Sequence, residues 1–173
     1  FPERRGDLML IKMEIFGLAM DEKTNMPLVI LKDEEDKYIL PIWIGALEAM
    51  AISIPLKGMS MPRPMTHDLF LDTLNNLGVH LLHVEVTEIK ESTYYAVLVL
   101  QQEENLLRID SRPSDAIAMA VRAKVPIMVR QQILEDIMKE HQGDYQVVLN
   151  DEESKKWAEI LEKFNLDDTK YKM

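Results

Sequence analysis

Apolar and polar residues alternate near the start of the chain, which is the pattern of a half-buried β-strand. Ile11, Met13 and Ile15 alternate with charged residues. A short apolar run at Leu28–Leu31 and the segment Tyr38–Ile44 follow, each after a polar stretch that is typical of a turn. This part of the chain therefore predicts three consecutive strands.

The period lengthens after Gly45, where apolar residues recur at the three- and four-residue spacing of a helix. We expect this first helix to kink or end at Pro55, because proline lacks the N–H group that an interior turn uses. A loop at 57–65 then leads to a second apolar stripe. The stripe predicts a second helix that Thr66 caps and Gly78 terminates.

The second half of the chain repeats this order of elements. Segments at 82–86, 94–100 and 105–110 are alternating or largely apolar and predict three strands. Pro113–Ala123 has the apolar spacing of a helix.

A constant shift of 67 residues, from position 48 to position 115, superposes similar residues of the two halves. It places Glu48 on Asp115 and Leu40 on Leu107. Such a repeat indicates a duplicated unit of three strands plus a helix, with an extra helix between the two copies. We therefore expect an α+β fold whose strands form a mixed sheet with helices packed on it.

The last part of the chain predicts three shorter elements: a helix at Gln131–Glu140, a strand at Tyr145–Leu149 and an amphipathic helix that Asn150 caps. We expect one domain at 8–130 and a C-terminal helical extension at 131–173. The apolar stripe of the last helix must be covered, either by the domain or by a second subunit. A homo-oligomer, with a dimer favoured, is therefore expected.

Composition limits the classes of protein that fit. With 173 residues, 47% of them hydrophobic, the chain can bury the core of one domain. No apolar run approaches the ~20 residues that a membrane-spanning helix needs. The absence of cysteine excludes disulfides, thiolate metal sites and a cysteine nucleophile. The first residues lack the apolar stretch of a secretory signal, so we expect a cytoplasmic protein without membrane contact.

Charge argues against a large nucleic-acid-binding face. Twenty basic and thirty acidic residues give a formal net charge of −10 at pH 7, whereas proteins that neutralise many phosphates usually carry a basic surface. The segment Arg108–Arg130 is an exception, because its five basic and two acidic residues give a net charge of +3. These cations either form a small patch for an anion or lie along a helix surface and pair with acidic residues elsewhere.

Two similar sequences lead into the second and third expected helices: MPRPMTHD at Met61–Asp68 and DSRPSD at Asp110–Asp115. Proline suits the first turn of a helix, and a hydroxyl residue and an aspartate satisfy free N–H groups there. These residues need no role beyond starting a helix. Arg63 and Arg112 have no such explanation, because a cation is unfavourable at a helix N-terminus.

Each of these two arginines therefore requires a nearby anion. One solution is a crossed set of ion pairs, Arg63 with Asp115 and Arg112 with Asp68, which requires the two junctions to fold side by side. The other is a phosphate group of a ligand, which guanidinium groups bind well.

Three segments together resemble the bifunctional nuclease family: LPIWIGALEAMAI at 40–52, RPMTHDL at 63–69 and IDSRPSDAIAMAVR at 109–122. The resemblance spans roughly residues 8 to 130. It implies a compact α+β domain found in bacteria and plants, with DNase and RNase activity attributed to some members. The resemblance carries no established set of catalytic residues, so a site has to be argued from chemistry.

Phosphodiester hydrolysis needs an activated water, charge stabilisation at the phosphoryl oxygens and a proton for the leaving oxygen. For a nuclease, the candidate catalytic residues are His67, Asp68 and Asp115, with His67 transferring the proton because imidazole titrates near neutral pH. Glu48, Asp68 and Asp115 are the candidate ligands of a Mg²⁺ or Mn²⁺ ion, since these ions prefer carboxylate oxygens.

Arg63 and Arg112 are the candidate ligands for the phosphate of a DNA or RNA substrate. Two alternatives remain open. A phosphate-binding module would use the same arginines without hydrolysis. A non-enzymatic interaction or regulatory domain would use both motifs only to build helices, and its methionine-rich loop or last helix would bind a protein.

Three other residues favour structural roles. His80 and His83 are expected on opposite faces of one strand, which is wrong for joint metal binding. Trp43 is expected to be buried between helix and sheet rather than to stack on a base.

Overall fold

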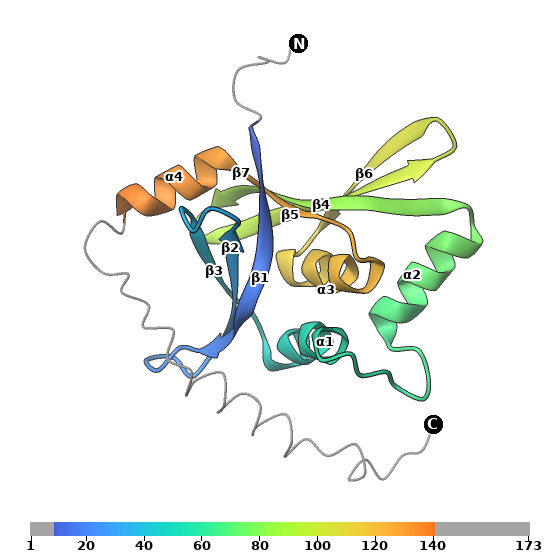
Figure 1. The fold of residues 1–173 in the computed structure, drawn as a ribbon, viewed down its shortest axis with the longest axis horizontal. Helices are drawn as coiled ribbons and strands as arrows, with labels where there is room; N and C mark the ends of the chain where they lie inside the picture. The colour runs from blue at the N-terminus through green and yellow to red at the C-terminus, as the bar shows by residue number, and fades with distance from the viewer. Residues whose placement is uncertain (1–8, 141–173) are drawn as a thin grey trace.

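The computed structural model describes residues 9–140 of the chain, which form seven strands and four helices (Figure 1). The strand at Tyr145–Leu149 and the last helix that we expected lie outside the described residues. The elements follow one another along the chain in this order: β1 (Leu10–Met20), β2 (Pro27–Asp33), β3 (Ile39–Trp43), α1 (Ala46–Leu56), α2 (Thr66–Asn76), β4 (Val79–Lys90), β5 (Thr93–Gln102), β6 (Asn105–Ser111), α3 (Pro113–Ala123), β7 (Ile127–Arg130) and α4 (Gln131–Glu140).

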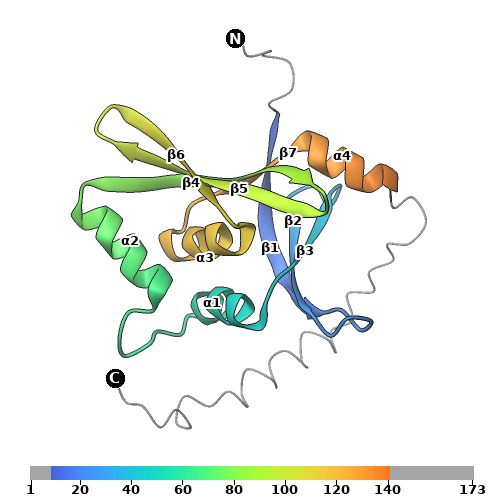
Figure 2. The same cartoon turned by 180° about the vertical axis from the view of Figure 1, so that it is seen from behind.

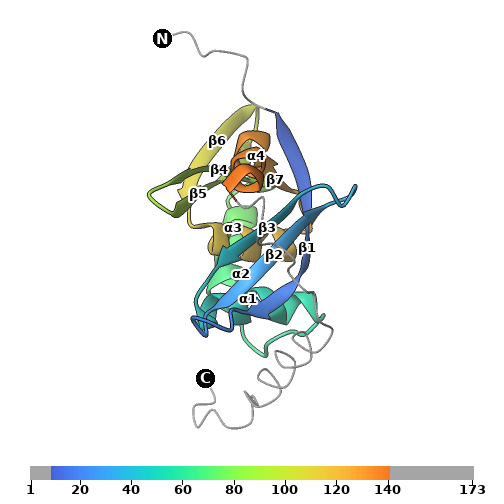
Figure 3. The same cartoon turned by 90° about the vertical axis from the view of Figure 1, so that its left-hand side faces the viewer.

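The described strands form one mixed sheet in the order β3-β2-β1-β7-β4-β5-β6. β7 runs parallel to β4, and the other neighbouring pairs in this sheet are antiparallel. The expectation of an α+β fold with a mixed sheet and packed helices is confirmed. β1–β3 and β4–β6 each form an antiparallel meander, and Figure 3 shows these two meanders on opposite sides of the molecule. That they are copies of one unit stays a prediction.

β7 joins the two meanders and was missed by the sequence patterns. It has only four residues, which is too short for an alternation to stand out. Ile127 and Val129 are nevertheless buried, and the strand pairs with β1 on one side and β4 on the other. A central position between two neighbours supplies the backbone hydrogen bonds that so short a strand needs.

Helices α1 and α3 lie side by side against the sheet, and α2 lies at one end of this layer (Figures 1 and 2). Helices α1 and α3 contact each other, and both carry buried alanines, among them Ala49, Ala116 and Ala120. On the other part of the sheet, α4 places Ile133 and Leu134 in the same core. In the described part of the chain, no helix is long and apolar enough to cross a membrane.

The helix boundaries agree with the sequence patterns except at one cap. α1 ends one residue beyond Pro55, and Gly78 has a left-handed φ of 73° just after α2, as expected for a terminator. Thr66, however, is the first residue of α2 rather than its cap. The N-cap is Met65, whose backbone N–H donates to Asp68 Oδ2 at 2.9 Å. The aspartate therefore performs the capping that we assigned to the threonine.

Candidate active site

The start of α3 carries an arginine and an aspartate that bind each other. Arg112 is the N-cap residue with an extended backbone, and Pro113 is the first residue of the helix. Arg112 Nε donates to Asp115 Oδ2 at 2.7 Å, and Nη2 donates to Asp115 Oδ1 at 3.1 Å. This bidentate pair offsets, within one turn, the unfavourable position of a cation at a helix N-terminus.

Glu48, in the first turn of α1, is a second anion on Arg112. Arg112 Nη1 donates to Glu48 Oε1 at 3.0 Å, which links the beginnings of α1 and α3. Gly45, the N-cap of α1, makes room for this arrangement, because a Cβ atom there would lie 2.1 Å from Glu48 Oε2. The glycine therefore lets the carboxylate fold back over its own helix N-terminus, where the helix dipole favours it.

His67 reaches the same cluster from a third helix. It lies in the first turn of α2, and its Nε2 is 2.9 Å from Asp115 Oδ1. The His67 and Asp115 side chains are 18% and 33% exposed. One carboxylate thus binds a guanidinium and an imidazole at the point where α1, α2 and α3 meet.

The charge state of the cluster follows from these contacts. Burial opposes ionisation of Asp115, but hydrogen bonds from Arg112 and His67 outweigh burial and hold the pKa of this carboxyl below its ordinary value. Bonds to Asp115 and Glu48 raise the pKa of Arg112. Asp115 is therefore a carboxylate and Arg112 a cation at neutral pH. Three of the five guanidinium N–H groups bind these carboxylates, which leaves two for a ligand.

Asp68 belongs to a neighbouring ion pair. Arg122 Nε donates to Asp68 Oδ1 at 2.6 Å, and its Nη1 donates to the carbonyls of Ala51 at 2.7 Å and Ala118 at 3.0 Å. Burial opposes ionisation of Asp68, but the Met65 N–H and Arg122 lower its pKa overall. With its side chain only 6% exposed, Arg122 ties α1, α2 and α3 together from inside.

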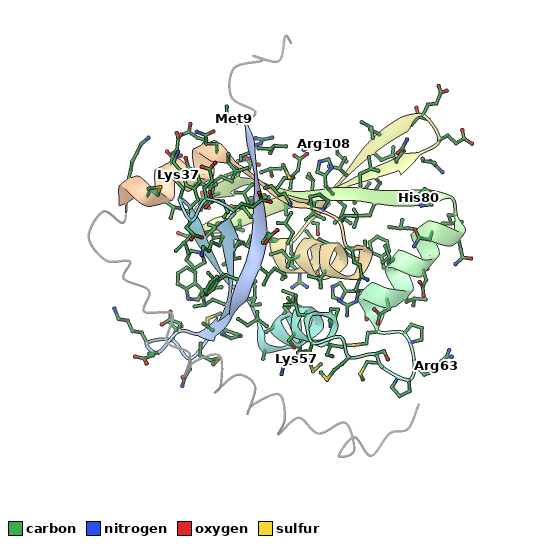
Figure 4. All side chains as sticks on the ribbon, in the orientation of Figure 1. Met9, Lys37, Lys57, Arg63, His80 and Arg108 are labelled. Atoms are coloured by element: carbon green, nitrogen blue, oxygen red, sulfur yellow. The ribbon has the colours of Figure 1, made fainter. Side chains whose placement is uncertain are left out.

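The crossed ion pairs expected from the sequence are wrong, although the two junctions do lie together. Asp115 pairs with Arg112 of its own turn, and Asp68 pairs with Arg122 instead of Arg112. Arg63 is exposed on the loop between α1 and α2, and its side chain points outward (Figure 4). The contact that joins the two junctions is between His67 and Asp115. The sequence patterns did not predict the role of Arg122, which they treated only as part of a basic segment.

The expected metal ligands fall into two groups. Glu48 and Asp115 share Arg112, whereas Asp68 binds Arg122 and the Met65 N–H. Residues 9–140 contain no group of three or more His, Asp or Glu side chains that could hold a metal ion together. A Mg²⁺ ion often uses only one or two carboxylates and completes its shell with water and substrate oxygens. Glu48 and Asp115, joined through Arg112, are the two expected ligands that lie together, and a metal ion there would share the Asp115 oxygens with Arg112 and His67.

A hollow of about 360 Å³ opens beside the cluster, with Arg112, Glu48 and Pro113 on its wall. Trp43 and Tyr94 also line it. Trp43 is 42% exposed, so the expectation that it is buried is wrong.

A second carboxylate–histidine pair lies on the sheet, away from these helices. Glu85 accepts two hydrogen bonds from Arg108, at 3.0 and 2.7 Å, and lies 2.9 Å from His83 Nε2. The expectation that His80 and His83 lie on opposite faces is wrong. The register of β4 on β5 shifts between Leu81 and His83, and this bulge returns both histidines to one face.

Comparison with known proteins identifies the family of this chain. The family model described as the bifunctional nuclease domain matches residues 29–142, which include all the residues of the cluster. An uncharacterised protein of Mycobacterium tuberculosis is 32% identical over 163 residues, which cover 92% of this chain and 98% of that protein.

Plant proteins named bifunctional nuclease 1 also match. The one from Oryza sativa subsp. indica is 28% identical over 65% of this chain, and the one from Arabidopsis thaliana is 29% identical over 61% of it. The matched parts are only 35% and 34% of these longer plant proteins. Because the family model covers more than half of the sequence, this chain belongs to the bifunctional nuclease domain family.

Proposed function

We propose that this protein hydrolyses phosphodiester bonds of DNA or RNA at the cluster of Arg112, Asp115, Glu48 and His67. The observation that carries the proposal is the double use of Asp115, which binds the Arg112 guanidinium at 2.7 Å and the His67 imidazole at 2.9 Å. Membership of the bifunctional nuclease domain family supports this class of reaction.

His67 would transfer the proton. Its Nε2 is held by the Asp115 carboxylate at 2.9 Å, which orients the ring. Nδ1 is then the nitrogen that exchanges a proton with the attacking water or the leaving oxygen. The same combination of carboxylate and imidazole serves hydrolases of unrelated folds.

Arg112 would stabilise negative charge on the phosphoryl oxygens. The Arg112 side chain is 64% exposed, yet three hydrogen bonds fix the position of its guanidinium. The two remaining N–H groups can bind oxygens of a phosphate. A cation held in place before the substrate arrives needs little reorganisation during the reaction.

The carboxylates explain why a divalent ion would help. The carboxylates of Glu48 and Asp115 outnumber the one guanidinium of Arg112, and this excess of negative charge repels a phosphate. A Mg²⁺ or Mn²⁺ ion held by Glu48 and Asp115 would supply positive charge and lower the pKa of a bound water. Asp68, bound to Arg122 and to the start of α2, acts as a positioning residue for the helix that carries His67.

The test is cleavage of labelled single-stranded RNA and DNA by the full chain in Mg²⁺, Mn²⁺ or EDTA. We expect Asp115→Asn and His67→Gln to lower the rate by about 10²-fold or more, as is usual when acid–base catalysis is lost. His83→Gln is the matched control. His83 also binds a carboxylate at 2.9 Å, but it does so on β4, and this variant should cleave at the wild-type rate.

Equal cleavage by the wild type and both site variants would reject this site. If no variant and no metal gives cleavage, while Asp115→Asn still destabilises the fold, the cluster only joins three helices. The domain would then be a non-enzymatic module, which is the alternative that the sequence left open.

A further inference from the structure

The hollow beside Arg112 has no role in the chemistry described above. Its volume of about 360 Å³ is near the lower end of the range for small-ligand sites, which suits one nucleoside but not a base pair in its duplex. Arg112 and Glu48 belong both to its wall and to the cluster. Any ligand that fills the hollow therefore lies next to the groups that would act on a phosphate.

We propose that this hollow binds one unstacked base of a single-stranded nucleic acid, with the adjoining phosphate on Arg112. The proposal rests on the proposed function and specifies its substrate. A base held there would leave its own phosphate within reach of the two guanidinium N–H groups that the carboxylates do not use.

Trp43 supplies a surface on which a base can stack. It is 42% exposed although tryptophan is usually well buried, and it lines the hollow. The indole N–H donates to Asp21 Oδ2 at 2.9 Å, which fixes the ring while leaving it accessible. A ring held in place loses little conformational freedom when a base stacks on it.

Tyr94 is a second aromatic residue on the same wall, and it comes from the other meander. Its hydroxyl donates a long hydrogen bond, 3.4 Å, to the carbonyl of Pro41. Ile42 and Ile44 are apolar residues that also line the hollow. Apolar walls with a few polar groups at one end are typical of sites for flat ring systems.

A requirement for an unpaired base follows from this shape. A base in a duplex must leave its stack and its partner before it can enter a pocket, which costs free energy that a single strand does not lose. The acidic composition of the chain agrees with such a site. A net charge of −10 disfavours long contacts with a phosphate backbone, whereas one base and one phosphate need a single cation.

Binding can be measured apart from cleavage. The chain has two tryptophans, so Trp157→Phe leaves Trp43 as the one tryptophan fluorophore of the full chain. Adenosine 5′-monophosphate should quench its emission in a saturable way, whereas ribose 5-phosphate and inorganic phosphate should not. Arg112→Gln should weaken the binding of the nucleotide by about tenfold, the usual effect of losing one charged contact.

Cleavage gives the second measurement. Wild-type protein should cleave single-stranded RNA or DNA at least tenfold faster than the same sequence in a duplex. Trp43→Leu should lower kcat/KM for the single strand by about tenfold, the effect expected when a stacking partner is lost, and Trp43→Phe should restore most of it. Phe16→Leu, which removes an aromatic side chain that is 47% exposed on β1, is the matched control and should have no effect.

The two proposals fail in different ways. Quenching by the nucleotide without any cleavage would remove the nuclease proposal and keep the base pocket. Cleavage that is equal for single strands and duplexes and unchanged in Trp43→Leu would remove the base pocket and keep the nuclease. Quenching by ribose 5-phosphate equal to that by the nucleotide would also overturn the pocket, because the base would then contribute nothing.

Discussion

Replacing Arg122 by methionine should destabilise the fold by about 2–4 kcal/mol, because the substitution removes one partner of a largely buried ion pair. The Arg122 side chain is 6% exposed and makes three hydrogen bonds, to Asp68 and to the carbonyls of Ala51 and Ala118. Methionine has a similar length and apolar stem, so the change removes charge and hydrogen bonds with little change in volume.

The magnitude follows from the exposure of the partners. Breaking a fully buried ion pair costs about 3–5 kcal/mol, but the Asp68 side chain is 36% exposed and keeps the Met65 N–H, so water can replace part of what is lost. Ala51 is only 5% exposed, and its carbonyl loses a charged hydrogen-bond donor when Arg122 is replaced. The expected loss of about 2–4 kcal/mol is a large fraction of the ~5–15 kcal/mol that stabilises a typical domain.

Urea unfolding followed by circular dichroism measures this loss. A double-mutant cycle with Asp68→Asn should give a coupling free energy of about 1–3 kcal/mol, because the effects of substituting two charged groups in contact are not additive. Arg122→Lys should recover only part of the stability, because an ammonium cannot reproduce the forked contacts of a guanidinium. If Arg122→Met unfolds within about 0.5 kcal/mol of the wild type, as a surface change would, the role assigned to Arg122 is wrong.

Two further substitutions test the remaining geometry. Glu85→Gln should lower stability at pH 7 by about 1–3 kcal/mol, a range reduced because the Arg108 partner is 48% exposed. Burial opposes ionisation of Glu85, but Arg108 and His83 hold its pKa below the ordinary 4.5. The difference in urea midpoint between the wild type and Glu85→Gln should therefore shrink as the pH falls below that value. A constant difference down to strongly acidic pH would contradict this. Gly45→Ala should displace the Glu48 carboxylate from Arg112, because the new Cβ would occupy the place of the carboxylate. This variant should cleave more slowly, while its free energy of unfolding changes by less than about 1 kcal/mol. Cleavage at the wild-type rate would show that Glu48 has no role in the reaction.

Local patterns in the sequence determined most of the elements. Strands alternate with period two and helices with period 3.6, and both periods depend only on backbone geometry. The turn at Gly78 and the start of α3 at Pro113 follow from the φ preferences of single residues. The resemblance of three segments to the bifunctional nuclease family is also a property of the sequence, and the family model confirms it.

The tertiary structure decided which charges meet. Asp115 and Asp68 are each the third residue of their helix, yet Asp115 binds Arg112 of its own turn and Asp68 binds Arg122, ten residues beyond Arg112. The spacing from arginine to aspartate differs, three residues in one motif and five in the other, but the contact of Asp68 with Arg122 depends on where α2 lies against α3. The short strand β7 and the bulge in β4 depend in the same way on their neighbours in the sheet. A periodic pattern specifies which face of an element is buried, but the partner of a charged side chain is set by distances in space, and these exist only once the helices have packed.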